Sequence, residues 1–160
     1  MNTTYLLLGS NEGNRFTWLQ SGIEHIRRIC GTIIEKSGIY ETSAWGIEDQ
    51  PDFLNQVICV HTLLDPEQLL AGIQETERLL GRQRIVKWGQ RTLDVDILFF
   101  NDTIWNEPHL KIPHPYLAER RFTLAPLAEI APGLMHPVLH KSVSTLLEEC
   151  SDPLAAKLIE

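Results

Sequence analysis

The sequence predicts an α+β fold, because short runs of β-branched and apolar residues alternate with segments of helical periodicity. The chain has 160 residues, of which 43% are hydrophobic. This length and composition suffice for one hydrophobic core, so we expect a single domain over residues 1–160. No apolar run approaches the ~20 residues that a transmembrane helix needs.

The predicted elements of the first half are strand 5–8, helix 16–30, strand 32–40, loop 41–52 and strand 53–63. The first strand ends at the turn signal Gly9-Ser10-Asn11. Apolar residues recur at helical spacing from Phe16 to Ile29, whereas the two later strands are rich in β-branched residues.

The predicted elements of the second half are helix 65–80, loop 81–91, strand 93–100, loop 101–116, helix 122–130 and one or two short helices after it. Asp65-Pro66-Glu67 has the order of cap, proline and acid that favours a helix start, and Gly81 ends that helix. Pro132 ends the helix predicted over residues 122–130.

Positive charge is concentrated around the loop 81–91. Five of the fourteen Lys and Arg residues lie there within fourteen positions, namely Arg78, Arg82, Arg84, Lys87 and Arg91. No acidic residue occurs between Glu77 and Asp94 to pair with them. Arginine guanidinium groups bind phosphate oxygens bidentately, so a phosphate-binding loop is one interpretation. A surface loop with an accidental charge bias is the other.

Two carboxylates follow on the next predicted strand. Side chains alternate along a strand, so Asp94 and Asp96 point the same way, about 7 Å apart, and Leu98 and Phe100 continue their face. Buried carboxylates need compensation, which arginine pairing could supply. A divalent metal is the favoured interpretation, because magnesium takes one or two carboxylates together with substrate phosphates.

Several other kinds of site and partner are excluded or disfavoured. The chain has neither a P-loop nor a dinucleotide fingerprint, and it has no HExxH or GxSxG motif. The net charge of −7 argues against nucleic-acid binding. Three distant cysteines and an N-terminus without signal-peptide features indicate the cytoplasm.

Six motifs together resemble those of one enzyme family. They are GSNEGN (9–14), DQPDFLN (49–55), GRQR (81–84), WGQRTLDVDIL (88–98), IPHP (112–115) and RRFTLAPLAEIAP (120–132). In this order they are similar to 6-hydroxymethyl-7,8-dihydropterin pyrophosphokinase of folate biosynthesis. The resemblance implies a ferredoxin-like α+β sandwich, with a mainly antiparallel sheet and helices packed on it. It also implies transfer of pyrophosphate from ATP to the pterin, with AMP released.

The resemblance further implies which residues bind each substrate. Asp94 and Asp96 match the ligands of Mg²⁺, of which two ions are expected with ATP. The positions implied for ATP binding are Gln74, Glu77, Arg82, Arg84, Trp88, Arg91, His114 and Arg120, with catalytic roles for Arg82 and Arg91. The positions implied for the pterin are Thr42, Trp45, Phe53, Asn55 and Phe122. We expect a monomer with no nucleic-acid or membrane partner.

Two other functions remain open at this point. A different magnesium-dependent phosphotransferase or nuclease could use the same aspartate pair, without any pterin. A non-catalytic ferredoxin-like binding module, such as an RNA binder, would instead need an exposed aromatic sheet and a basic surface.

Overall fold

A computed structural model describes residues 1–43, 51–81 and 92–160 of the chain. Six strands form one sheet in the order β5-β1-β4-β3-β8, with β2 also paired to β4. Their bounds are β1 Asn2–Ser10, β2 Thr32–Lys36, β3 Tyr40–Thr42, β4 Phe53–Thr62, β5 Asp94–Phe100 and β8 Lys157–Leu158. Every strand pairing in this sheet is antiparallel.

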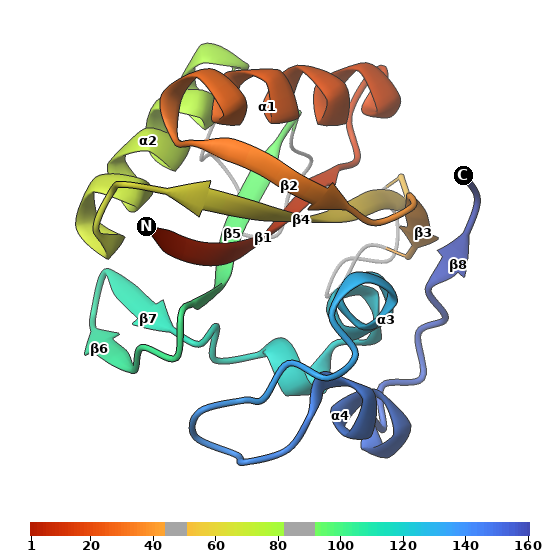
Figure 1. The fold of residues 1–160 in the computed structure, drawn as a ribbon. Helices are drawn as coiled ribbons and strands as arrows, with labels where there is room; N and C mark the ends of the chain where they lie inside the picture. The colour runs from red at the N-terminus through yellow and green to blue at the C-terminus, as the bar shows by residue number, and fades with distance from the viewer. Residues whose placement is uncertain (44–50, 82–91) are drawn as a thin grey trace.

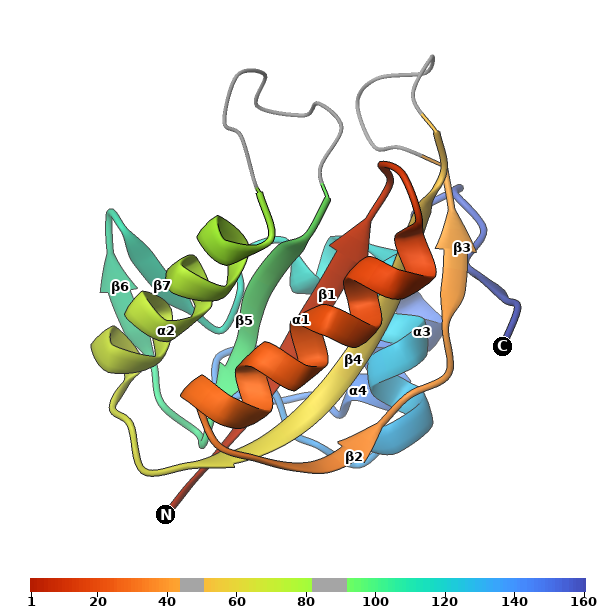
Figure 2. The same cartoon turned by 90° about the horizontal axis from the view of Figure 1, so that it is seen from above.

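Helices cover both faces of the sheet. Two helices, α1 Arg15–Ile29 and α2 Pro66–Leu79, lie side by side over one face (Figures 1 and 2). On the opposite face lie α3 Arg121–Ile130 and α4 Val143–Glu149, together with a short 3-10 helix, Leu117–Glu119. A separate hairpin, β6 Trp105–Glu107 and β7 Leu110–Ile112, lies beside β5 (Figure 2).

The central strand β1 contributes to a hydrophobic core on each face of the sheet. Leu6 and Leu8 pack under α1 and α2, while Leu7 packs under α3 and α4, and all three are buried. Alternating side chains of a strand point to opposite faces, so a strand covered on both sides is apolar throughout. The run Tyr5–Leu8 that predicted this strand has this character.

The structure corrects three parts of the predicted secondary structure. The strand predicted over residues 32–40 is two strands, β2 and β3, which pair with different parts of β4. The loop predicted over residues 101–116 contains the β6–β7 hairpin, and β8 follows α4. The strands β3, β6, β7 and β8 each have only two or three residues. A strand of this length is too short to show an alternating hydrophobic pattern in the sequence.

The predicted faces of β5 are correct only as far as Leu98. The pairing of β5 with β1 shifts register between Tyr5 and Leu6, which are opposite Phe99 and Ile97. After this irregularity Phe99 packs in the same core as Leu98, and Phe100 packs in the other core. The expectation that Phe100 shares the face of the aspartates is therefore wrong, because a bulge reverses the alternation.

Helix caps confirm the predicted helix starts. The carboxylate of Asp65 accepts from Gln68 N, and the Gln68 side chain accepts from Asp65 N, which is a reciprocal capping box at the start of α2. Asn14, the last residue of GSNEGN, caps α1 by accepting from Thr17 N. That motif therefore ends one strand and starts the next helix.

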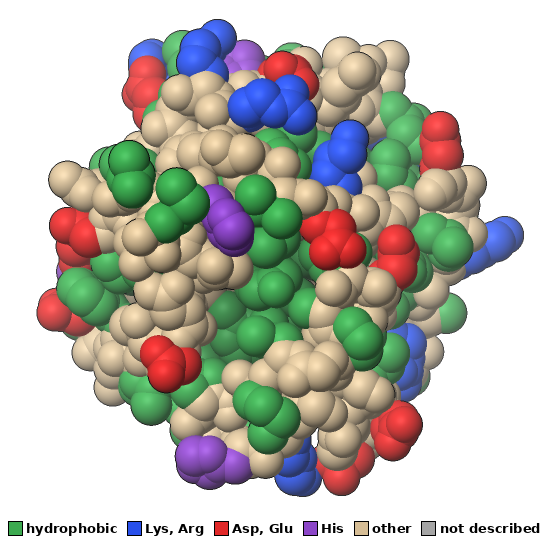
Figure 3. Space-filling view, viewed as in Figure 1, with side chains coloured by type: hydrophobic (Ala, Val, Ile, Leu, Met, Phe, Trp, Pro, Cys, Tyr) green, Lys and Arg blue, Asp and Glu red, His purple; other side chains and the backbone are tan. Residues whose placement is uncertain are grey.

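The described residues on one face of the molecule show no continuous basic surface. On the face seen in Figure 3, acidic and basic side chains are interspersed around the rim, and the centre is a hollow lined by hydrophobic side chains. Nucleic-acid binding needs a continuous basic field instead. Within the described residues, no helix combines the length and the apolar character required to cross a bilayer.

Candidate active site

Three sequence motifs meet at Gly9, at the end of β1. Gly9 is the register partner of Asn55 on β4 and of Asp94 on β5. A Cβ at position 9 would lie 3.0 Å from Asn55 Oδ1 and 3.6 Å from Phe53 Cδ1. The glycine of GSNEGN therefore allows close packing against DQPDFLN, beside the aspartate pair.

A pocket opens where these strands end. We call it the Phe53–Phe122 pocket, and its lining residues are Leu7, Gly9, Thr42, Ser43, Phe53, Asn55, Asp94, Asp96, Arg120 and Phe122. Seven of them are residues that the sequence predicted for substrate or metal binding. These seven come from β3, β4, β5 and the start of α3, so the fold brings together distant motifs.

Asn55 has a buried amide group on the wall of this pocket. Its side chain is 3% exposed, and its Nδ2 atom has no hydrogen-bond partner among the described residues. A buried amide donor without a partner costs free energy, so a ligand with an acceptor at this place is favoured. Phe53 and Phe122 line the same pocket and offer aromatic faces for stacking.

Arg120 brings a positive charge to the aspartate pair. It is buried, and its guanidinium carbon lies 4.9 Å from the ring centroid of Tyr116 and 5.5 Å from that of Phe122. Burial lowers the pKa of Arg120, whereas Asp96 and Asp94 act in the opposite direction. An arginine still remains charged in proteins. The guanidinium thus lies near two aromatic rings and is close enough to the two carboxylates to interact with their charge.

The aspartate pair is held by a buried glutamate. Asp94 and Asp96 both line the Phe53–Phe122 pocket, and between them Val95 N donates to Glu77 Oε2 at 2.8 Å. Glu77 is only 4% exposed, so this bond fixes the start of β5 against α2. Two carboxylates on one strand face, open to the pocket, are suitable oxygen ligands for Mg²⁺ when phosphates complete its coordination. No group of three or more metal-binding side chains occurs among the residues that the structure describes.

His114 is a neutral hydrogen-bond donor next to Asp96. Burial, followed by the charge of Arg120, lowers its pKa to about 4, against a smaller opposing effect of Asp94. Its Nδ1 atom accepts from Tyr116 N at 3.2 Å, which leaves the proton on Nε2. Nε2 is 3.9 Å from Asp96 Oδ2. The imidazole can therefore donate to an oxygen placed beside the aspartate.

A second pocket lies on the other side of Asp96. We call it the Leu70–Lys111 pocket, and it is lined by Leu70, Val95, Asp96, Ile97, Pro108, His109, Leu110, Lys111, His114 and Pro115. Since β5 is the edge strand of the sheet, this pocket lies between that edge, α2 and the β6–β7 hairpin. The sequence predicted Asp96 and His114 here but none of the hairpin residues. The IPHP motif, which begins at Ile112, the last residue of β7, was the sequence signal for this region.

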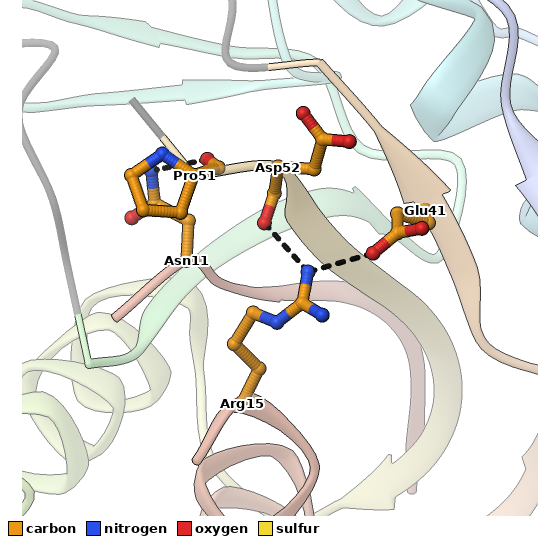
Figure 4. A network of polar contacts seen from close by, with 5 residues as sticks. All are labelled: Asn11, Arg15, Glu41, Pro51 and Asp52. Atoms are coloured by element: carbon orange, nitrogen blue, oxygen red, sulfur yellow. Dashed lines mark hydrogen bonds and ion pairs between the residues drawn. The ribbon is translucent and has the colours of Figure 1, made fainter. Parts of the chain in front are cut away.

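A polar network outside the lining joins both strands that flank the Phe53–Phe122 pocket (Figure 4). Arg15 NH1, at the start of α1, donates to Glu41 Oε2 of β3 at 2.8 Å and to the Asp52 carbonyl at 2.9 Å. Asn11 donates to the Pro51 carbonyl at 3.2 Å. Thr42 and Phe53, the next residues along each strand, are register partners.

Comparisons with known proteins decide the family. The family model for 7,8-dihydro-6-hydroxymethylpterin-pyrophosphokinase (HPPK) matches residues 5–132. This chain belongs to the HPPK family. It is 41% identical over 150 residues to the pyrophosphokinase of Aquifex aeolicus, covering 93% of this chain and 92% of that one. It is 45% identical over 130 residues to the pyrophosphokinase of Bacillus subtilis, covering 81% of this chain and 78% of that one.

Solved HPPK-containing structures share the fold. The Plasmodium falciparum HPPK-DHPS with SDX-DHP has a TM-score of 0.73 at 21% identity, over 93% of this chain and 43% of that one. The A437G variant with STZ-DHP has a TM-score of 0.78 at 19% identity, over 92% and 45%. The chain therefore spans less than half the length of these longer proteins. The predicted ferredoxin-like α+β fold is confirmed, and membership of the HPPK family makes the chain a pyrophosphokinase of folate biosynthesis.

The structure describes some but not all of the predicted HPPK site residues. Trp45, Arg82, Arg84, Trp88 and Arg91 lie outside the described residues. Gln74 is exposed on α2 and lines neither pocket, although Glu77 on the same helix holds β5. Among the described residues, the structure thus brings together the predicted metal ligands and the pterin residues Thr42, Phe53, Asn55 and Phe122, with His114 and Arg120 beside them.

Proposed function

We propose that the chain transfers pyrophosphate from ATP to 6-hydroxymethyl-7,8-dihydropterin, with the pterin bound in the Phe53–Phe122 pocket. HPPK family membership supports the reaction. The observation that carries the placement is the buried amide of Asn55, which lacks a partner among the described residues, next to two aromatic side chains. A pterin is a flat ring with an amide-like edge, so it can stack on Phe53 and Phe122 while its edge pairs with Asn55.

We propose that Asp94 and Asp96 are the ligands of two Mg²⁺ ions, which bind together with ATP. Their shared strand face and their opening to the pocket support this assignment. The bound metal would neutralise phosphate charge and polarise the phosphorus that is attacked. The role of Glu77 is then to keep the two carboxylates in place through Val95 N.

The Leu70–Lys111 pocket is the proposed place for the nucleoside part of ATP. It shares Asp96 with the Phe53–Phe122 pocket, so the triphosphate of ATP would pass Asp96 and lie between the nucleoside and the pterin. The hairpin contributes the cation of Lys111, and Val95, Asp96 and Ile97 of β5 form the opposite side of the pocket. This geometry favours a nucleotide whose terminal phosphates face the pterin.

The reaction requires positioning rather than a covalent intermediate. The hydroxymethyl oxygen of the pterin attacks the β-phosphorus, the bond between that phosphorus and the α-bridging oxygen breaks, AMP leaves and the hydroxyl proton goes to solvent. Arg120 and the neutral His114 can bind the phosphate oxygens, because both are beside Asp96. In-line placement and charge neutralisation supply most of the rate enhancement in such transfers.

The remaining ATP contacts are proposed from motif positions. Arg82 and Arg91 would be catalytic arginines on the transferring phosphates, and Arg84, Trp88 and Gln74 would complete the nucleotide contacts. Trp45 would add to the pterin wall. The acid-free, arginine-rich composition of residues 81–91 supports the phosphate role.

We also propose a cytoplasmic monomer with one catalytic domain over residues 1–160. The described cysteines Cys30, Cys59 and Cys150 are all free thiols, which is the state expected in a reducing compartment. The two hydrophobic cores lie on opposite faces of one sheet, which supports a single domain. Size-exclusion chromatography with light scattering would test the monomer.

The test is a coupled assay with ATP, Mg²⁺ and 6-hydroxymethyl-7,8-dihydropterin, run on the wild type and on Asp96→Ala. The expected result is AMP formation that depends on the pterin and on Mg²⁺, and that is lost in the variant. Release of ADP, or release of AMP without pterin, would contradict the proposal and favour a different phosphotransferase.

A further inference from the structure

The C-terminal segment, residues 150–160, runs from α4 past the start of α3 to the outer side of β3 (Figure 1). It lies beyond residues 5–132, which the HPPK family model matches, and no motif marked it in the sequence. It nevertheless contacts both walls of the Phe53–Phe122 pocket. Thr42 and Phe53 form one wall on β3 and β4, and Arg120 and Phe122 form the other at the start of α3.

On the α3 wall, Asp152 takes the place of a local helix cap. Arg120 is the N-cap residue of α3 and makes no side-chain capping bond. Instead Asp152 Oδ2 accepts from Arg121 N at 3.0 Å, while its Oδ1 accepts from Leu154 N at 2.9 Å. Asp152 is only 8% exposed, and Arg121 NH2 also donates to the Cys150 carbonyl at 3.0 Å. A carboxylate that accepts backbone N–H groups at a helix start is a strong, directional contact.

On the opposite wall, the same segment binds β3. Thr42 Oγ1 donates to the Ala155 carbonyl at 3.0 Å. Two residues further on, β8 pairs with β3, with Glu41 opposite Lys157 and Tyr40 opposite Leu158. The side-chain hydroxyl of Thr42 is therefore oriented by the C-terminal segment, at the place where Thr42 lines the pocket.

The other end of α3 has its own connection to β3. Glu129, near the end of α3, accepts from Tyr40 OH at 2.7 Å and from Gly38 N. That end of the helix is therefore held without the C-terminal segment. Only the pocket end, which carries Arg120 and Phe122, depends on Asp152 for the bond to its first backbone N–H group.

We propose that Asp152 is a positioning residue for pterin binding, which fixes the start of α3 relative to β3 and so sets the separation of the two pocket walls. Both oxygens of Asp152 accept from backbone N–H groups, so Asp152 acts through Arg121 N, next to Phe122, and its segment acts through Thr42. A flat ring stacked between two walls is sensitive to their separation, because stacking is lost within an ångström or so. The inference rests on the proposed function for the nature of the ligand.

The test is a graded series of the full-length chain: wild type, Asp152→Asn and Asp152→Ala. The asparagine can accept only one of the two backbone bonds with its single oxygen, and the alanine accepts neither. We expect the KM for the pterin to rise about tenfold in Asp152→Ala and about threefold in Asp152→Asn, as lost charge-assisted hydrogen bonds imply. The KM for ATP should stay within about twofold of wild type.

Ser142→Ala is the matched control. Ser142 caps α4 by accepting from Thr145 N, and α4 packs on α3 but does not line the pocket. This variant should lower the melting temperature and leave the pterin KM unchanged. A pterin KM that rises equally in Ser142→Ala would show a general stability effect and overturn the role of Asp152.

An unchanged pterin KM in both Asp152 variants would also overturn the inference. If Asp152→Ala does not fold, the threefold change expected in Asp152→Asn decides the matter. A wild type without pterin-dependent AMP formation would overturn the proposed function instead, and with it the choice of ligand. The two failures are therefore distinguishable in one set of measurements.

Discussion

The Phe53–Phe122 pocket and the Leu70–Lys111 pocket share Asp96 but are otherwise lined by different kinds of residues. The first is lined by aromatic and amide side chains that come from strand ends and from the start of α3. The second lies between the edge strand β5, α2 and a short hairpin, where apolar residues are mixed with two histidines and Lys111. The difference shows that each substrate can have its own recognition surface while a single strand end supplies the carboxylates for both.

The largest effect should follow a change at the shared residue. Asp96→Asn keeps the shape but removes the charge needed for Mg²⁺, so kcat should fall about 10³-fold or more. Steady-state AMP formation at saturating ATP and pterin measures this. Asp102→Asn, on an exposed residue after the other end of β5, should be neutral. A fall below tenfold in Asp96→Asn would argue against metal ligation.

A substitution confined to the Phe53–Phe122 pocket should change the KM for the pterin and not the KM for ATP. Phe122→Ala removes one stacking face, worth about 2 kcal/mol, so the KM for the pterin should rise about 30-fold. The KM for ATP should be nearly unchanged. Phe16→Ala is the control, because Phe16 is exposed at the start of α1. An equal rise in the KM for the pterin and in the KM for ATP would contradict separate binding of the two substrates in the two pockets.

A substitution in the Leu70–Lys111 pocket should have the converse effect, on the KM for ATP and not on the KM for the pterin. Leu70 lines it from α2, so Leu70→Ala should raise the KM for ATP about fivefold and leave the pterin KM unchanged. Leu79→Ala is the matched control, since Leu79 is an exposed leucine of the same helix. Isothermal titration with an ATP analogue would separate binding from turnover. Weaker pterin binding in Leu70→Ala would show that the assignment of this pocket to ATP is wrong.

The smallest effect should come from the network behind the Phe53–Phe122 pocket. Arg15→Ala removes the bonds to Glu41 and to the Asp52 carbonyl, and we expect about a threefold rise in the pterin KM. Arg15→Lys should recover part of the loss, because it keeps one charged donor. Arg27→Ala, which breaks the exposed pair with Glu24 on the same helix, should have no effect. An Arg15→Ala variant with wild-type KM would mean that the strands are held well enough without it.

The sequence predicted the Phe53–Phe122 pocket better than the other one for a physical reason. Stacking, amide pairing and metal ligation each need particular side chains, so Phe53, Asn55 and Asp94 stand in recognisable motifs. The hairpin pocket depends on β6 and β7, which are too short to have a detectable period.

Two further features could not be read from local sequence. The bulge that moves Phe100 to the other face arises from the pairing of β5 with β1, which is a tertiary property. Asp152 caps a helix that starts 31 residues earlier, so no capping signature is visible near Arg121. The main helices, by contrast, were predicted correctly because their caps and periodicity are local.

The most direct test of the two-pocket arrangement is a crystal structure with Mg²⁺, an α,β-methylene analogue of ATP and 6-hydroxymethylpterin. The arrangement predicts the pterin ring between Phe53 and Phe122, metal bound by Asp94 and Asp96, and the adenosine in the pocket lined by Leu70 and Lys111. A pterin outside the Phe53–Phe122 pocket, or metal without a bond to either aspartate, would contradict it.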